Sequence, residues 1–168
     1  MKLELKHIAS YLPYAVKIYD YNAYPVCGFF EMNHNGGTGM IAISELLASP
    51  RLYKIALRPI YDLTNEISHN GRKFIPIEAL LDIETEINWS SSDHLNTDFM
   101  EKTHYTKIEG GSTFGYNESG YFYIIDKYDR YCPVKKQKEL FETMYEWGID
   151  LNGLIDQGLA IDINTIEL

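Results

Sequence analysis

The sequence predicts an α+β fold, with a small antiparallel sheet and hairpins segregated from short helices and from one longer C-terminal amphipathic helix. Runs of β-branched and aromatic residues at 15–20, 24–32 and 121–125 have the composition of strands. The brief polar connection between the first two favours an antiparallel hairpin. Apolar residues recur over 134–147 at the spacing of one helix face, which predicts the longer helix and the burial of Leu140, Phe141, Met144 and Trp147.

The first third of the sequence is expected to place a helix, the hairpin and a further strand in that order. Apolar residues at helical spacing predict a helix over 4–12. Residues 40–48 are apolar without a decisive period, so a strand and a helical turn both stay open there. A half-buried strand over 54–58 ends at Pro59, because proline donates no ladder hydrogen bond.

The central residues have the densest local patterns. Asp62 is placed to cap a short helix over 63–69, because its carboxylate can accept amide hydrogens of the first turn. Asn70 and Gly71 tolerate a positive φ, so they can either end that helix or turn a hairpin. Pro76 then suits the first position of a second helix with an apolar side.

The segment 84–111 is polar with few apolar anchors, and we expect it to be mobile or variable. At its end, residues 105–108 are expected to pair with the strand at 121–125. Gly148 is the expected stop of the helix over 134–147.

The last residues are expected to form a short helix and a tail. Asp150 is placed to cap a helix that runs to Gln157, and residues 159–163 are expected to finish as an extended tail.

Length and charge bound the classes of protein. The 168 residues suit a single globular domain, 1–168, which would bury about two thirds of the surface of the unfolded chain. Twenty-four acidic and fifteen basic residues give a net charge of −9, which repels nucleic acids and anionic membranes. The one cluster of lysines, at 135–138, precedes several glutamates, so we interpret it as a solvated helix face with a Lys138–Glu142 pair.

Cysteine usage and the N-terminal sequence predict a cytoplasmic protein. Cys27 and Cys132 belong to no CxxC pair, and buried free thiols are expected for both, with one disulfide as the alternative in an exported protein. The start lacks the apolar run of a signal peptide, and no window resembles a membrane span.

Three segments show a family resemblance. They are IASYLPYAVKIYD at 8–20, LRPIYDLTNEISHNGRKFIPIEAL at 57–80 and WGIDLNGLIDQGLAIDIN at 147–164. Together they cover about a third of the sequence and resemble a family of small uncharacterised proteins of gut bacteria and of their prophages and phages. The family has no established activity, so the resemblance implies no catalytic residue. It does imply an intracellular protein that originates in a phage or mobile element.

Three patterns suggest chemistry, and each has a simpler interpretation. The string GTGMIA at 37–42 matches GxGxxA, but the expected hairpin before it contradicts the βαβ unit that a dinucleotide site needs, so a flexible loop is favoured. The carboxylates of Asp82, Glu84 and Glu86 could serve a glycosidase, but strand alternation or one helical turn would place them on a solvated face, which is the favoured interpretation.

The third pattern is the densest group of histidines and acids. Its members, Asp93, His94, Asp98, Glu101 and His104, lack the HExxH or paired-cysteine spacing of a metal centre. We therefore expect no metal and no cofactor, and a polar loop is the favoured interpretation.

Aromatic residues offer a candidate binding surface. Trp89, Tyr105, Phe114 and Tyr116 are our candidates for contacts with a partner protein, since tyrosine and tryptophan bury area while keeping a polar tip. For the rings of 121–125, a position in the core is the favoured alternative.

Three hypotheses about function follow. The leading one is a non-catalytic protein of a phage or mobile element that acts by protein binding or by self-association. The second is a small hydrolase or transferase with a site near Asp93, His94 and His104. The third is an acidic mimic of nucleic acid that inhibits a host DNA-binding protein.

Overall fold

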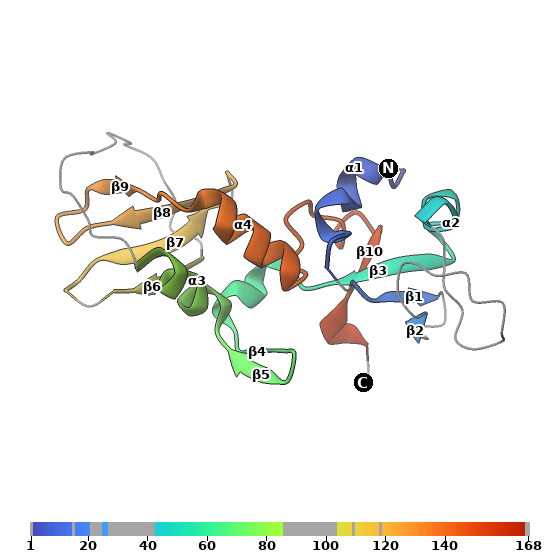
Figure 1. Ribbon diagram of the computed structural model, residues 1–168, viewed down its shortest axis with the longest axis horizontal. Coiled ribbons are helices and arrows are strands. Elements are labelled where there is room, and N and C mark those ends of the chain that lie inside the picture. Colours follow the sequence, from blue (N-terminus) through green and yellow to red (C-terminus); the bar gives the residue numbers. More distant parts are fainter. Residues whose placement is uncertain are drawn as a thin grey trace. The chain divides into compact units, whose positions relative to one another are not determined.

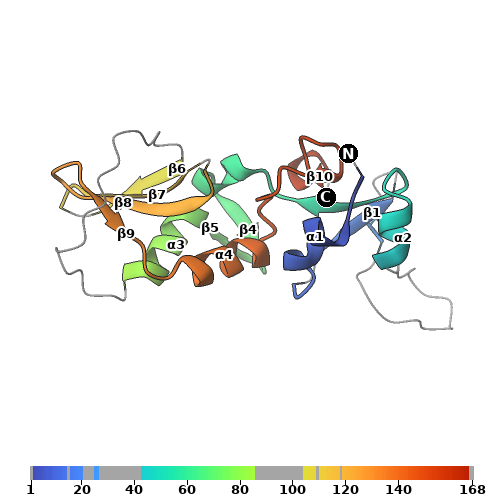
Figure 2. The same cartoon turned by 90° about the horizontal axis from the view of Figure 1, so that it is seen from above.

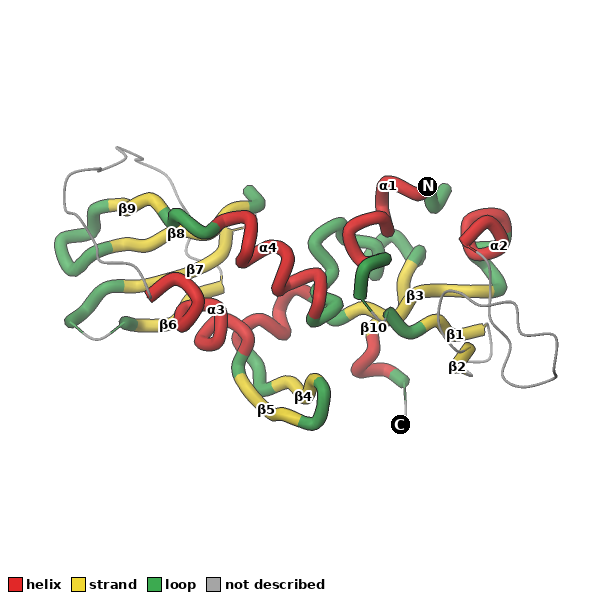
Figure 3. Tube along the Cα trace, viewed as in Figure 1, coloured by secondary structure: helices red, strands yellow, loops and turns green. Residues whose placement is uncertain are grey.

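The structure is a computed structural model that describes residues 2–14, 16–20, 25–26, 43–85, 104–108, 110–117 and 119–166 (Figure 1). Helices and small, mainly antiparallel sheets alternate along the sequence (Figure 3), which confirms the predicted α+β class. The protein forms two compact units, Met1–Ile60 with Met144–Leu168, and Tyr61–Thr143, and each is described by itself. Whether they constitute the single domain expected over 1–168 stays a prediction.

The first unit is built on a four-stranded sheet with the order β10-β3-β1-β2. Its strands are β1 (Ile18–Asp20), β2 (Pro25–Val26), β3 (Tyr53–Leu57) and β10 (Ala160–Asp162). β1 pairs with β2 in an antiparallel hairpin, as predicted, and also with β3. The segment 159–163 is extended as predicted, and within it β10 pairs with β3 in parallel. This pairing joins two segments that are far apart in the sequence, which no local pattern reveals.

Short helices complete the first unit. They are α1 (Leu5–Ile8), η1 (Ala9–Tyr11), α2 (Ile43–Ala48) and η3 (Ile163–Thr165). The first two fall within the helix predicted over 4–12. For residues 40–48, where a strand and a helical turn both stayed open, the described residues Ile43–Ala48 form the helix α2. The core of the unit gathers residues from α1, β1, β3 and the C-terminal segment.

Tyr11 ties the C-terminal segment into this core. Its ring is buried, and its hydroxyl donates to the carbonyl oxygen of Ile149 at 2.8 Å and accepts from the amide of Leu151 at 3.0 Å. Asp150 lies between these two residues and accepts from the amides of Leu154 at 2.9 Å and Ile155 at 2.7 Å. The carboxylate thus caps as predicted, but it caps a series of turns, and no helix forms up to residue 157.

The second unit contains a four-stranded antiparallel sheet with the order β6-β7-β8-β9. Its strands are β6 (His104–Lys107), β7 (Thr113–Asn117), β8 (Tyr121–Ile125) and β9 (Tyr131–Pro133). The expected direct pairing of 105–108 with 121–125 is wrong, because β7 lies between β6 and β8. The glycine in TFGYN weakens the strand pattern of β7, so the sequence pattern does not reveal this strand.

A hairpin replaces the helix predicted over 63–69. The 3-10 helix η2 (Ile60–Thr64) includes the buried Asp62, and β4 (Ile67–His69) then pairs with β5 (Arg72–Phe74). Asn70 and Gly71 make the turn with φ angles of 50° and 76°, the signs that a two-residue hairpin loop requires. The hairpin alternative that the sequence left open at this pair is therefore correct.

Two helices of about equal length follow. α3 (Pro76–Thr85) starts at Pro76 as predicted. α4 (Gln137–Glu146) is shorter than the predicted helix over 134–147, because residues 134–136 lead from β9 into the helix and the amides of Lys135 and Lys136 donate there to the Glu84 carboxylate. Leu140 and Met144 are buried as expected, whereas Phe141 and Trp147 are only half-buried. Gly148, with a φ of 72°, follows the helix as its stop.

Candidate functional site

Strand register sorts the aromatic residues of the second unit onto two opposite faces of its sheet. Tyr105 lies opposite Gly115, and Gly115 lies opposite Tyr123. Because side chains alternate along a strand, Tyr121 and Tyr131 project on this same side. We call the side that holds Tyr105, Tyr121, Tyr123 and Tyr131 the tyrosine face.

The opposite face is the packed interior of the unit. Phe114 stacks on Phe122 with ring centroids 5.7 Å apart, and Tyr116 lies 5.1 Å from Phe122. Phe141 of α4 closes this cluster at 5.4 Å from Phe122. α3 packs against β6 and β7, and Figure 2 shows α3 and α4 on the same side of the sheet. The described helices therefore cover this face and leave the tyrosine face to other contacts.

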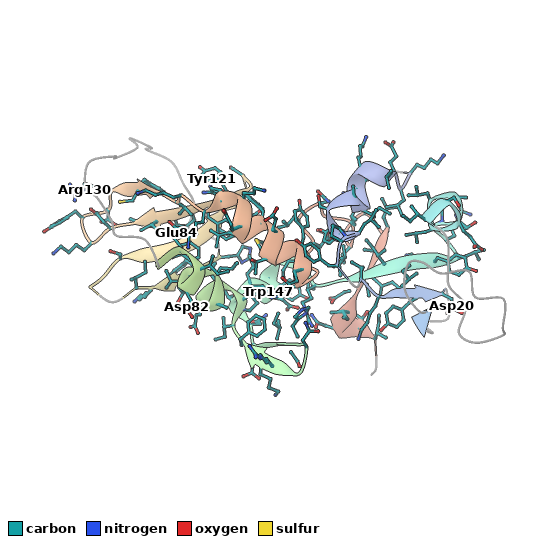
Figure 4. All side chains as sticks on the ribbon, viewed as in Figure 1. Asp20, Asp82, Glu84, Tyr121, Arg130 and Trp147 are labelled. Atoms are coloured by element: carbon teal, nitrogen blue, oxygen red, sulfur yellow. The ribbon has the colours of Figure 1, made fainter. Side chains whose placement is uncertain are left out.

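A buried carboxylate holds the two covering helices together. Glu84, near the end of α3, is only 1% exposed and accepts from the backbone amides of Lys135 at 3.1 Å and Lys136 at 3.2 Å (Figure 4). The ammonium group of Lys136 donates to the carbonyl oxygen of Ile83 at 2.7 Å. The prediction of a solvated face for the carboxylates is thus wrong for Glu84, whereas Asp82 is exposed and Glu86 lies outside the described residues. The buried carboxylate fixes the segment that leads into α4.

The start of α4 is also fastened to the sheet. The side-chain amide of Gln137 donates to the carbonyl oxygen of Phe122 at 2.7 Å and accepts from the amide of Phe122 at 3.1 Å. A strand neighbour would make the same pair of bonds, so Gln137 extends the hydrogen bonding of β8. This fixed packing on one side makes the sheet a rigid support for the tyrosines on the other.

The rings of the tyrosine face differ in exposure. Tyr105, on the edge strand β6, is 44% exposed, while Tyr121 and Tyr131 are half-buried. Tyr123 lies between them and is buried, with its ring centroid 6.0 Å from that of Tyr131. Lys107 is exposed at the end of the same face, and the described strands contribute no acidic side chain to it. The face is therefore aromatic and rich in hydrogen-bond donors within a strongly acidic protein.

Tyr123 owes its position to Gly115. A methyl group on Gly115 would lie 2.5 Å from the Cζ and hydroxyl oxygen of Tyr123 and 2.7 Å from the carbonyl oxygen of His104, so the ring covers the glycine directly. The Tyr123 hydroxyl is buried and has no hydrogen-bond partner within the described residues. Burial, together with the phenols of Tyr131 and Tyr105, raises the pKa of Tyr123 to about 12. The Tyr123 hydroxyl is thus a protonated group at neutral pH that is buried within the tyrosine face.

The turn between β8 and β9 is ordered by an internal ion pair. Asp126 accepts from the amides of Tyr128 and Arg130 and pairs with the Arg130 guanidinium (Figure 4). These bonds lower the pKa of Asp126 to about 2, and the hydrogen bond from the Arg130 side chain is the largest cause of this shift. Tyr128 stands exposed at the tip, with the cations of Lys127 and Arg130 each 5.0 Å from its ring centre.

The structure separates the residues that we expected to form a binding surface. Tyr105 lies exposed on the tyrosine face. Phe114 and Tyr116 lie on the opposite face and are buried, so these two side chains offer no surface to a partner. Trp89 lies outside the described residues. The sequence of β8 contains the pattern that identifies the tyrosine face, because Tyr121 and Tyr123 alternate with phenylalanine and isoleucine.

The residues proposed for catalysis are not brought together in the described part of the protein. Asp93 and His94, like residues 37–42 and Cys27, lie outside it, and His104 lies half-buried on the helix-covered face of β6. Across the described ranges, no three His, Cys, Asp or Glu side chains are grouped to hold a metal ion. Cys132 is a free thiol as expected, but it is half-buried and not buried, and this partial burial raises the pKa of the thiol.

Comparisons with protein-family models, with curated proteins and with solved structures found no match. Among the described helices, none has the length and apolar character required to cross a membrane.

Proposed function

We propose that the protein is a non-catalytic binding protein whose tyrosine face receives a protein partner. The observation that supports the proposal is the division of the sheet, in which α3 and α4 cover one face and Tyr105, Tyr121 and Tyr131 stand at least partly exposed on the other. Tyrosine is enriched at protein interfaces, because its ring buries apolar area and its hydroxyl still forms hydrogen bonds. Few rotatable bonds also limit the entropy lost when such a side chain is fixed.

The chemistry of the face favours a partner rich in hydrogen-bond acceptors. The phenols of Tyr105, Tyr121 and Tyr131 and the ammonium group of Lys107 can donate hydrogen bonds, and no described side chain from the strands of this face is acidic. Exposed main-chain carbonyls or carboxylates of a partner would complement these groups without the repulsion that a net charge of −9 exerts elsewhere. The resemblance to proteins of gut bacteria and their phages extends the proposal to a mobile-element protein that acts in the cytoplasm.

Site-specific photo-crosslinking tests the proposal. A photoreactive phenylalanine analogue replaces Tyr105 in one variant and Tyr61 in another, and each variant is irradiated in induced host cells. Tyr61 is the matched control, because it is 51% exposed and belongs to the same unit but lies in η2, outside the sheet. We expect a discrete crosslinked protein at position 105 and none in common with position 61.

The mass of the crosslinked species distinguishes a foreign partner from a second copy of the protein. Equal crosslinking at both positions, or none at position 105, would contradict binding through the tyrosine face.

A further inference from the structure

The turn between β4 and β5 is open to a spontaneous chemical change. Asn70 and Gly71 form a two-residue loop, since the paired strands end with His69 opposite Arg72. Both loop residues are exposed, and a methyl group on Gly71 would meet no atom within 4 Å. Gly71 thus has no side chain and no neighbouring atom at its Cβ position that would crowd the loop next to Asn70.

We infer that Asn70 is a modification site at which the folded protein deamidates to aspartate and isoaspartate. The Gly71 amide loses its proton to hydroxide, and its nitrogen attacks the Asn70 Cγ to form a new C–N bond. The bond between Cγ and Nδ2 of Asn70 breaks, and ammonia leaves after taking a proton from water. Water then opens the cyclic imide at one of its two carbonyls, giving aspartate or isoaspartate. The net reaction consumes one water, releases one ammonia and involves no oxidation.

The free-energy barrier to the attack of the Gly71 nitrogen on Asn70 is low in this hairpin. The attack requires Asn70 to leave its turn conformation, which disturbs only two strands of three residues each. Most side chains of the hairpin are exposed or half-buried, and Ile67 is its single buried member. Isolated two-stranded hairpins are marginally stable, and such exposed segments open locally at little cost in free energy.

A second Asn-Gly pair in the described structure is restrained. The side-chain amide of Asn152 donates to the carbonyl oxygen of His7 at 2.9 Å. Its own main-chain carbonyl oxygen accepts from the side-chain amide of Gln157, also at 2.9 Å. Both bonds must break before the Gly153 nitrogen can reach the Asn152 side chain, so this pair has the same sequence but a slower expected reaction.

The two products affect the hairpin differently. Aspartate followed by glycine still suits the same turn. Isoaspartate lengthens the backbone within the loop, which opposes the register that places Ile67 opposite Phe74. Either product adds a negative charge beside the exposed Arg72 and Lys73.

Peptide mapping by mass spectrometry measures the reaction. The purified full-length protein is incubated at mildly alkaline pH and physiological temperature, and the peptides that contain Asn70 and Asn152 are followed over time. Isoaspartate is identified with a protein isoaspartyl methyltransferase and a labelled methyl donor. We expect Asn70 to convert roughly tenfold faster than Asn152 or more, because two additional hydrogen bonds restrain Asn152.

Two controls separate the structure from the sequence. In denaturant, the Asn70 and Asn152 peptides should convert at similar rates, since glycine follows both. The Gln157→Ala variant should accelerate conversion at Asn152 and leave Asn70 unchanged. Conversion of Asn152 as fast as that of Asn70 in the folded protein would overturn the inference, as would a rate difference that persists in denaturant.

Discussion

Replacing Gly115 by alanine tests the geometry of the tyrosine face. The added methyl would lie 2.5 Å from the Tyr123 ring and 2.7 Å from the carbonyl oxygen of His104. Gly115 does not have a positive φ, so the cost is steric and not conformational. The carbonyl of His104 is held in the backbone of the paired strand β6, so the Tyr123 ring is the group that must move. Overpacking of this kind costs about 1–3 kcal/mol of the free energy of unfolding.

Urea or thermal unfolding measures this cost, and a double-mutant cycle assigns it. In the Tyr123→Ala background the ring is absent, so the Gly115→Ala change should cost at least ~1 kcal/mol less than in the parent. The Tyr123→Phe background should give no such relief, because the Cζ atom stays in place. A neutral Gly115→Ala variant, or an equal cost in all three backgrounds, would refute the reasoning.

The remaining predictions concern hydrogen bonds and titration. Tyr123→Phe should leave stability unchanged or raise it slightly, because its buried hydroxyl has no partner within the described residues. Tyr11→Phe should cost about 1–3 kcal/mol, because it removes the two hydrogen bonds that join the buried hydroxyl to Ile149 and Leu151; urea titrations compare the two. Glu84→Gln should lower the free energy of unfolding by about 1–3 kcal/mol, since one of its two acceptor oxygens becomes a donor facing an amide, and an unchanged urea midpoint would argue against this role of the carboxylate. In an ultraviolet titration, one phenol should ionise with a pKa of about 12, and this transition should be absent from the Tyr123→Phe variant. Because the folded pKa of Tyr123 is raised, the free energy of unfolding should fall as the pH rises from ~10 to 12. Carboxyl NMR should find Asp126 ionised down to about pH 2. Because its folded pKa is depressed, its contribution to stability is present above pH ~4 and is lost as the pH falls from there to 2. The Arg130→Ala variant removes the partner and should return the pKa of Asp126 toward its ordinary value.

Local patterns predict the elements whose determinants are close in the sequence. Pro76 at the start of α3 and Gly148 after α4 act through their own backbone preferences, so the sequence reveals both. The predicted Lys138–Glu142 pair on α4 is present, with a distance of 3.5 Å.

The errors share a different physical origin. Ile67 belongs to a strand because its partner Phe74 offers a pairing that the helical pattern of 63–69 does not show. Likewise, Glu84 is buried because its carboxylate meets two amides more than fifty residues away. Such contacts override local propensity and have no signature in the neighbouring residues.

The candidate site can be predicted only in part, because the strand register decides which aromatic side chains lie on the tyrosine face. The sequence identifies Tyr105, but it also suggests Phe114 and Tyr116, although their register places them on the opposite face. Recognising β7 as a separate strand would have assigned its aromatic residues to the interior and Tyr121 and Tyr131 to the surface.

The affinity of the crosslinked partner for matched tyrosine variants tests the central claim most directly. Isothermal titration compares Tyr105→Ala and Tyr131→Ala with Tyr61→Ala, after equal folding has been verified by circular dichroism. We expect each change on the tyrosine face to weaken binding at least about fivefold, as for loss of an interface anchor worth ~1 kcal/mol or more, and we expect Tyr61→Ala to bind like the parent. Unaltered affinity in both face variants would contradict binding through the tyrosine face.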